Sequence, residues 1–199
     1  MTTSLLTHAV CIEHDTSESH PESPERLRRI LKRLETPEFK KLQFQEAPKA
    51  NIAQITKVHP QNQIDRIFSK IPKTGYSKMD RDTIASPKSG EAALRAAGAV
   101  IAAVDTVMSG KSGNAFCATR PPGHHAEANQ SMGFCIFNNV AIGAFHARER
   151  YKLDRIAVID FDVHHGNGTQ KTFWHEPEML YASTHQSPLY PGTGIPSER

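Results

Sequence analysis

The pattern of apolar and polar positions along the chain predicts strands and helices in alternation. Short apolar runs at residues 5–12, 114–118 and 179–183 are typical of buried strands. Residues 155–161 (Arg-Ile-Ala-Val-Ile-Asp-Phe) form the most continuous apolar run. That continuity is characteristic of a parallel strand covered on both faces, so we expect a covered strand there.

Helices are predicted between these strands. Ser23 followed by Pro24 marks a helix start, and apolar residues at helical spacing continue to Leu34. Other helices are expected at 60–68, from Ser86-Pro87 to Gly110, at 137–150 and at 169–174, with a long loop over 70–86. The alternation predicts an α/β fold, in which a mainly parallel sheet is flanked by helices. Sites in such folds lie beyond the carboxyl ends of the strands.

Composition narrows the class of protein. The 199 residues fit one domain, 1–199, and the 38% hydrophobic and 23% charged residues suit a globular protein. A net charge of +3 without a dense Lys/Arg stripe argues against direct nucleic-acid binding. No apolar run reaches the roughly 18 residues of a membrane span, and the start lacks a signal-peptide pattern. The three cysteines are widely spaced, so we expect no disulfide framework and a reducing, cytoplasmic location.

A tandem histidine pair follows the strand predicted at 114–118. The segment 120–126 reads Arg-Pro-Pro-Gly-His-His-Ala, so a rigid turn presents His124 and His125 where the strand ends. Histidine is the side chain best suited to proton transfer near neutral pH. The alternative interpretation is an exposed loop with two incidental histidines.

A second polar group follows the strand predicted at 155–161. In an extended backbone alternate residues point the same way, so Asp160, Asp162 and His164 are expected on one side. A carboxylate and an imidazole two positions apart can share a divalent ion of the zinc class. Asp160, less exposed, suits an acceptor that holds a histidine N–H. The alternative is a set of acidic residues that cap the next helix.

Four segments together resemble the signature sequences of the histone deacetylase superfamily. They are His-Pro-Glu-Ser-Pro-Glu-Arg (20–26), the tandem histidine segment (120–126), Gly-Phe-Cys-Ile-Phe-Asn-Asn (133–139) and Asp-Phe-Asp-Val-His-His-Gly-Asn-Gly-Thr (160–169). The superfamily also includes acetylpolyamine amidohydrolases and acetoin-utilisation proteins. The four segments most resemble those of class II and bacterial histone-deacetylase-like members. It implies a three-layer fold of the arginase/deacetylase type.

The resemblance also implies roles for residues at matching positions. Asp162 and His164 would be two zinc ligands. His124 and His125 would activate water and protonate the leaving amine. Asp160 would bond to His124.

Further implied roles concern a second ion and the substrate. Asp160 would help to bind a potassium ion together with Ser183. Gly133 and Phe134 would line a tunnel for an acyl-lysine-like chain, and Asp82 would hold the substrate backbone at the rim. The implied substrates are acetylated lysines of proteins or peptides, or acetylated small amines such as polyamines. Asn167 replaces an aspartate found in class I members, which indicates the class II-like subclass.

The zinc site is expected to be incomplete. Catalytic zinc has three protein ligands and a water, and this sequence offers two. In the family the third ligand, an aspartate, comes later than the segments that this sequence matches, and so do the catalytic tyrosine and the last strands. Tyr190 is not expected to be that tyrosine. The sequence therefore predicts weak metal binding and little hydrolysis. A non-catalytic scaffold with the same fold remains open, as does a manganese ureohydrolase, which the Asp-x-Asp-x-His motif fits poorly.

Overall fold

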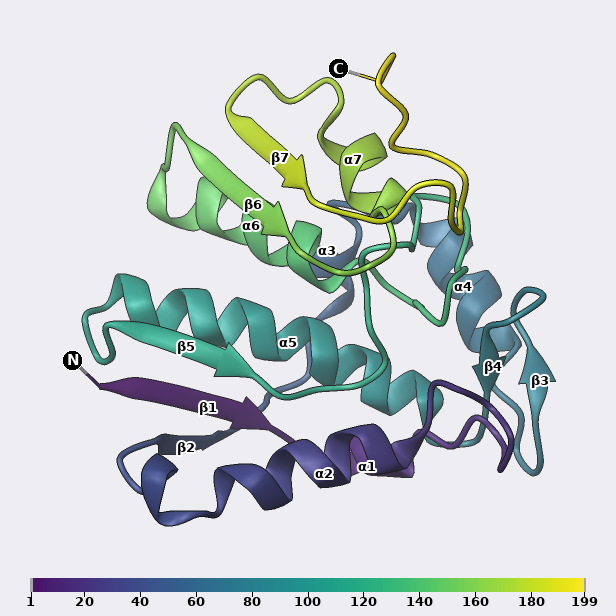
Figure 1. Cartoon of the computed structure of the whole chain (residues 1–199), viewed down its shortest axis with the longest axis horizontal. Coiled ribbons are helices and arrows are strands. Elements are labelled where there is room, and N and C mark those ends of the chain that lie inside the picture. The colour runs from purple at the N-terminus through teal and green to yellow at the C-terminus, as the bar shows by residue number, and fades with distance from the viewer. Residues whose placement is uncertain (1, 199) are drawn as a thin grey trace.

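The computed structural model describes residues 2–198 and shows an α/β fold in which five of the strands run in parallel, in two groups (Figure 1). In the first group the strand order is β2-β1-β5, and in the second β6 pairs with β7. Their bounds are β1 (Thr3–Thr7), β2 (Gln43–Glu46), β5 (Asn114–Cys117), β6 (Ile156–Asp160) and β7 (Met179–Ser183). All five carboxyl ends point to the same side of the molecule, which is where the expected site residues follow.

Strand β1 lies in the middle of three layers. Leu6 packs against the alanine-rich helix α5 (Ser89–Met108) on one face of the strand. Leu5 packs on the other face with Leu27, which comes from helix α2 (Pro24–Leu34). Helices therefore cover this group of strands from both sides, as Figure 1 shows.

The pair β6–β7 is covered on one face only by the described residues. Ile156 and Val158 pack against the core that helices α6 (Asn139–Tyr151) and α7 (Asn167–Phe173) help to build. On the opposite face Ile159 is 61% exposed. The expectation of a strand covered on both faces is therefore wrong here, because within residues 2–198 the helix layer lies on one side of β6.

The alanines of α5 are explained by close packing. The chain at Pro48 crosses so near this helix that a Cβ added to Gly98 would lie 2.0 Å from the Pro48 carbonyl oxygen. Small side chains also let α5 and α6 approach one another. Close packing of this kind brings α5 against the strand layer, where it contacts β1 and β5.

Two local expectations differ from the structure. The run at 5–12 is a strand only to Thr7, because the His8 side chain accepts the Val10 N–H at 3.0 Å and helix α1 (Val10–Glu13) begins there. The loop expected at 70–86 contains a short antiparallel pair, β3 (Ser77–Lys78) and β4 (Ile84–Ala85).

The remaining elements complete the chain. Helix α5 begins at Ser89 rather than at Ser86, whose backbone N–H donates to the Ser89 hydroxyl. The other elements are η1 (Pro37–Phe39), α3 (Ile52–Ile55) and α4 (Gln61–Ser69). Among residues 2–198 no helix combines the length and the apolar character that crossing a membrane requires.

Candidate active site

The carboxyl ends of the strands surround a cavity of about 480 Å³. Its wall contains most of the predicted site residues, namely Asp82, His124, His125, Gly133, Phe134, Asp162 and His164, and also Pro21, Arg26, Pro122, Val163 and Tyr190. Segments that are far apart in sequence therefore meet at the place that the parallel-sheet rule indicates.

The two tandem histidines have different partners. Their ring centroids are 4.0 Å apart. The Nδ1 atom of His124 lies 2.9 Å from the Asp160 carboxylate, whereas that of His125 lies 2.8 Å from the Asn167 amide oxygen. Since both partners are acceptors, each ring carries its proton on Nδ1 and keeps Nε2 as the basic nitrogen.

Electrostatics separates the two rings further. Burial, followed by the neighbouring charge of His124, lowers the pKa of His125 to about 4, and the neutral Asn167 amide opposes this only in part. His125 is therefore neutral at pH 7. Burial acts to raise the pKa of Asp160, but the hydrogen bond and charge of His124 outweigh it and the pKa is lowered. Asp160 stays ionised and can balance a positive charge on His124.

Asp160 is held at the end of β6 by several donors. One carboxylate oxygen accepts from the Tyr181 hydroxyl at 3.0 Å, and the other accepts from the Asp162 N–H at 3.2 Å. Ser183 is its register partner on β7, and the Ser183 hydroxyl lies 2.8 Å from Nδ1 of His185. The oxygens expected to bind potassium thus come from neighbouring positions on paired strands.

Asp162 and His164 face one another beyond the end of β6. The Asp162 Oδ1 atom lies 3.2 Å from Nδ1 of His164, and their side chains are 47% and 36% exposed. Two ligands of a tetrahedral zinc ion, each about 2.1 Å from it, lie roughly 3.4 Å apart. The donor types and their spacing therefore fit zinc. Among residues 2–198, however, no three His, Cys, Asp or Glu side chains gather as a metal site, so the ligand set found here is partial.

The cavity rim is formed by two backbone amides and their acceptors. Asp82 Oδ1 accepts the Gly133 N–H, and the Thr83 hydroxyl accepts the Phe134 N–H, both at 3.1 Å. Gly133 has φ +57°, and a Cβ at this position would lie 2.4 Å from the His125 ring. Glycine is therefore required beside the tandem histidines. Burial, with the charge of Asp80, raises the pKa of Asp82.

Two cavity residues with polar side chains, Tyr190 and Arg26, were not among the residues predicted for the site. Tyr190 presents its ring edge-on to His125, with ring centroids 5.1 Å apart, and to His164 at 6.1 Å. Burial, and then the charge of Asp82, raises the Tyr190 pKa, so the phenol stays protonated. Its place in the loop after β7 was the available signal, since loops at that edge of the sheet reach the site. Arg26 reaches the cavity from α2.

The fold and the cavity together define a class of protein. It is a parallel α/β protein with two tandem histidines beside a carboxylate–imidazole pair. Residues 20–199 match the family described as the histone deacetylase domain. The chain belongs to the histone deacetylase family.

Relatives and a solved structure agree with this membership. The chain is 38% identical to a histone deacetylase-like amidohydrolase of Pseudomonas aeruginosa over 181 residues, which is 90% of this chain and 47% of the relative. It is 39% identical to a probable deacetylase of Methanothermobacter thermautotrophicus over 197 residues, 98% of this chain and 58% of the relative.

The fold resembles the crystal structure of the HDA15 HD domain with a TM-score of 0.93 at 33% identity, covering 100% of this chain and 58% of that one. The two curated relatives are likewise matched over 47% and 58% of their lengths. This chain therefore spans about half the length of the proteins it resembles. The α/β fold expected from the sequence is confirmed.

Proposed function

We propose that this chain carries the proton-transfer residues and two zinc ligands of a deacetylase that removes acetyl or short acyl groups from amines. One observation supports the proposal most strongly: His124 and His125, each with its own acceptor, share a cavity with the facing pair Asp162 and His164. Such a group of residues suits hydrolysis of an amide. The names of the matched relatives, an amidohydrolase and a probable deacetylase, point the same way.

The histidines divide the proton transfers between them. Zinc, when bound by Asp162 and His164, would polarise the amide carbonyl and make water more acidic. His125, neutral at pH 7, is in the state that a general base needs. His124, when protonated at Nε2 as well as Nδ1, would carry a positive charge beside Asp160 and could give the Nε2 proton to the leaving amine. The proton that His125 takes from water would then pass to solvent, from which His124 is protonated again. The products are a short carboxylic acid and a free amine.

A potassium ion would fit the same framework. The carboxylate and backbone oxygens of Asp160 and the hydroxyl of Ser183 are hard oxygen donors at neighbouring positions. A cation there would offset the charge of the Asp160 carboxylate, which is largely withdrawn from water. It would also weaken the attraction of that carboxylate for the proton on His124.

The substrate is proposed to be an acetylated lysine in a protein or peptide, or an acetylated small amine. Gly133 and Phe134 would line the path of the acyl-amine chain, and Asp82 at the rim would accept a substrate N–H. Three free thiols, Cys11, Cys117 and Cys135, support a reducing, cytoplasmic location.

The described residues bring two zinc ligands together where catalytic zinc has three. We therefore expect this chain by itself to bind zinc weakly and to hydrolyse little or no acetyl-lysine peptide. A partial ligand set also favours a second candidate, a non-catalytic scaffold that keeps the deacetylase fold.

Zinc content and peptide hydrolysis distinguish these functions. Zinc bound after dialysis would be measured for this chain and for its Asp162→Asn and His164→Ala variants, and we expect each substitution to abolish weak binding. Hydrolysis would be compared with the Pseudomonas amidohydrolase, both whole and cut to the part that aligns with this chain. Zinc binding that is unchanged in both variants would contradict the proposed site. A chain that binds neither zinc nor acetyl-lysine peptide would favour the scaffold.

A further inference from the structure

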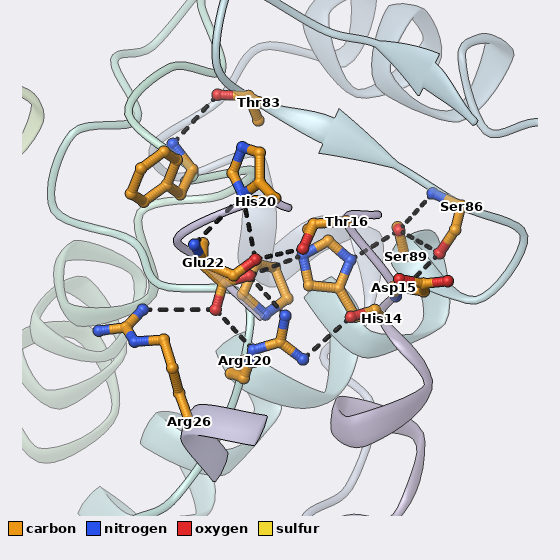
Figure 2. Close-up of polar contacts among 12 residues, drawn as sticks. His14, Asp15, Thr16, His20, Glu22, Arg26, Thr83, Ser86, Ser89 and Arg120 are labelled. Carbon is orange, nitrogen blue, oxygen red and sulfur yellow. Dashed lines mark hydrogen bonds and ion pairs between the residues drawn. The ribbon is translucent and has the colours of Figure 1, made fainter. Parts of the chain in front are cut away.

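A buried ion pair joins the segment that follows the cavity-lining Pro21 to the loop of the tandem histidines, and the proposed mechanism does not use it. Glu22 is 0% exposed and Arg120 is 4% exposed. Their contact is bidentate, with Arg120 Nε donating to one Glu22 oxygen and Nη2 to the other, both at 2.5 Å (Figure 2). Arg120 Nη1 also donates to the carbonyls of Cys11 and His14 at 2.9 Å. Since Arg120 opens the loop that carries the tandem histidines, this pair anchors the loop.

His20 connects that anchor to the cavity rim. The backbone N–H of Glu22 donates to Nδ1 of His20 at 3.2 Å, and Nε2 of His20 lies 3.0 Å from the backbone carbonyl of Asp82. The Glu22 carbonyl, which also lies near Nδ1, accepts a hydrogen bond from the Thr16 hydroxyl. One arrangement satisfies every group: Nδ1 accepts from Glu22 and Nε2–H donates to Asp82.

The same ring touches the cavity wall. His20 packs edge-on against Phe134, with ring centroids 5.0 Å apart and an angle of 73° between the ring planes. Asp82 and the neighbouring Thr83 accept the N–H groups of Gly133 and Phe134. His20 is therefore in contact with both sides of the rim, the acceptors at 82–83 and the wall at 133–134.

We propose that His20 is a positioning residue for the substrate end of the cavity. Fixed through Glu22 to the buried Arg120, it holds the Asp82 backbone and the Phe134 ring at the spacing that a substrate chain requires. The link to substrate rests on the proposed deacetylase function, whereas the link between the two sides of the rim does not.

Amide hydrogen exchange tests the positioning role without activity. In a ¹⁵N-labelled His20→Ala chain, Gly133 and Phe134 amides should exchange roughly 5- to 10-fold faster, since loss of one hydrogen bond loosens their acceptors by about that factor. Core amides of α5 should be unchanged. His20→Gln, which keeps a donor for Asp82, should recover part of the protection, and His175→Ala, at an exposed histidine, is the matched control.

Unchanged exchange at Gly133 and Phe134 would overturn the proposal. Equal acceleration of all amides would overturn it as well, because His20 would then contribute only to global stability.

A titration observed at the Phe134 amide tests the link to substrate. An acetyl-lysine peptide, whose backbone N–H groups can reach Asp82, should bind His20→Ala several-fold more weakly than the unchanged chain. An acetylated diamine, which has no peptide backbone to reach Asp82, should lose less affinity, because only its contact with Phe134 is affected. Equal affinity of the acetyl-lysine peptide for the two chains would overturn the substrate role. An unchanged chain that binds neither ligand would count against the deacetylase function, and the exchange result would still decide the positioning role.

Discussion

Two acid–base pairs beside the same cavity are built in opposite ways. Glu22 and Arg120 are almost completely buried, and their polar atoms contact residues from several segments of the chain. Asp162 and His164 are 47% and 36% exposed, and the Asp162 carboxylate accepts the His164 backbone N–H and lies 3.2 Å from Nδ1 of its ring. The first pair is closed by protein and the second is open to a ligand.

The difference follows from the cost of removing charge from water. A buried ion pair persists only where geometry and additional hydrogen bonds compensate for desolvation, and Glu22 with Arg120 meets both conditions. An exposed pair contributes little to folding but keeps its lone pairs available. The chain therefore uses buried charge to fix the cavity and exposed donors to bind what enters it.

The largest expected effect comes from breaking the buried pair. Glu22→Gln keeps the shape of the side chain but leaves the Arg120 charge without a counter-ion, so the free energy of unfolding should fall by about 3–5 kcal/mol. Urea unfolding followed by circular dichroism measures this. The double substitution Glu22→Met with Arg120→Met should cost less than the two single changes added together. A loss below about 1 kcal/mol for Glu22→Gln would mean that the pair is not an anchor.

The next largest effect is expected from acid, which should lower the free energy of unfolding. Burial lowers the pKa of His14 and of His59 to about 4 in the fold, against 6.5 for an ordinary histidine. Between these values the unfolded chain binds more protons, so stability falls as pH falls from 6.5 toward 4. From pH 7.5 to 5 each residue should cost about 2 kcal/mol.

Urea unfolding at the two pH values measures this loss. His59→Gln should reduce the pH dependence, whereas substitution of the exposed His175 should not. A free energy of unfolding that stays constant down to pH 5 would contradict the neutral, buried state of both rings.

The smallest effect on folding is expected at the open pair. Asp162→Asn or His164→Ala should change the free energy of unfolding by no more than about 0.5 kcal/mol, because both side chains are partly exposed. Added zinc should raise the melting temperature of the unchanged chain slightly and should not raise that of either variant. A large loss of stability without metal would show that the pair is structural.

Much of the architecture could be predicted from local patterns. The strands at 114–118, 155–161 and 179–183 were placed to within about two residues, because their apolar runs are short and bounded by polar turns. The start of α2 at Pro24 also agrees, although Ser23 makes no side-chain cap. Strand β2 was not predicted, because Gln43–Glu46 has little apolar character. In the structure Phe44 is 69% exposed, so the strand buries little apolar surface.

The candidate site was predictable where its residues are close in sequence. His124 with His125, and Asp162 with His164, follow strand ends, and the common direction of parallel strands brings such ends together. Tyr190 in the cavity wall and His20, which contacts Phe134, were harder to find, because loops decide where both residues lie. The partnership of Glu22 with Arg120 joins positions 98 residues apart.

The sequence by itself determined the class of fold, the family resemblance and the chemistry available at two strand ends, because these depend on periodicity and on neighbouring residues. Only the tertiary structure decided that one face of β6 is open in residues 2–198, that Asp82 and Phe134 share a rim through His20, and that a buried Glu22–Arg120 pair supports the histidine loop. Burial and long-range pairing decide these features, and both arise only when distant segments pack and exclude water.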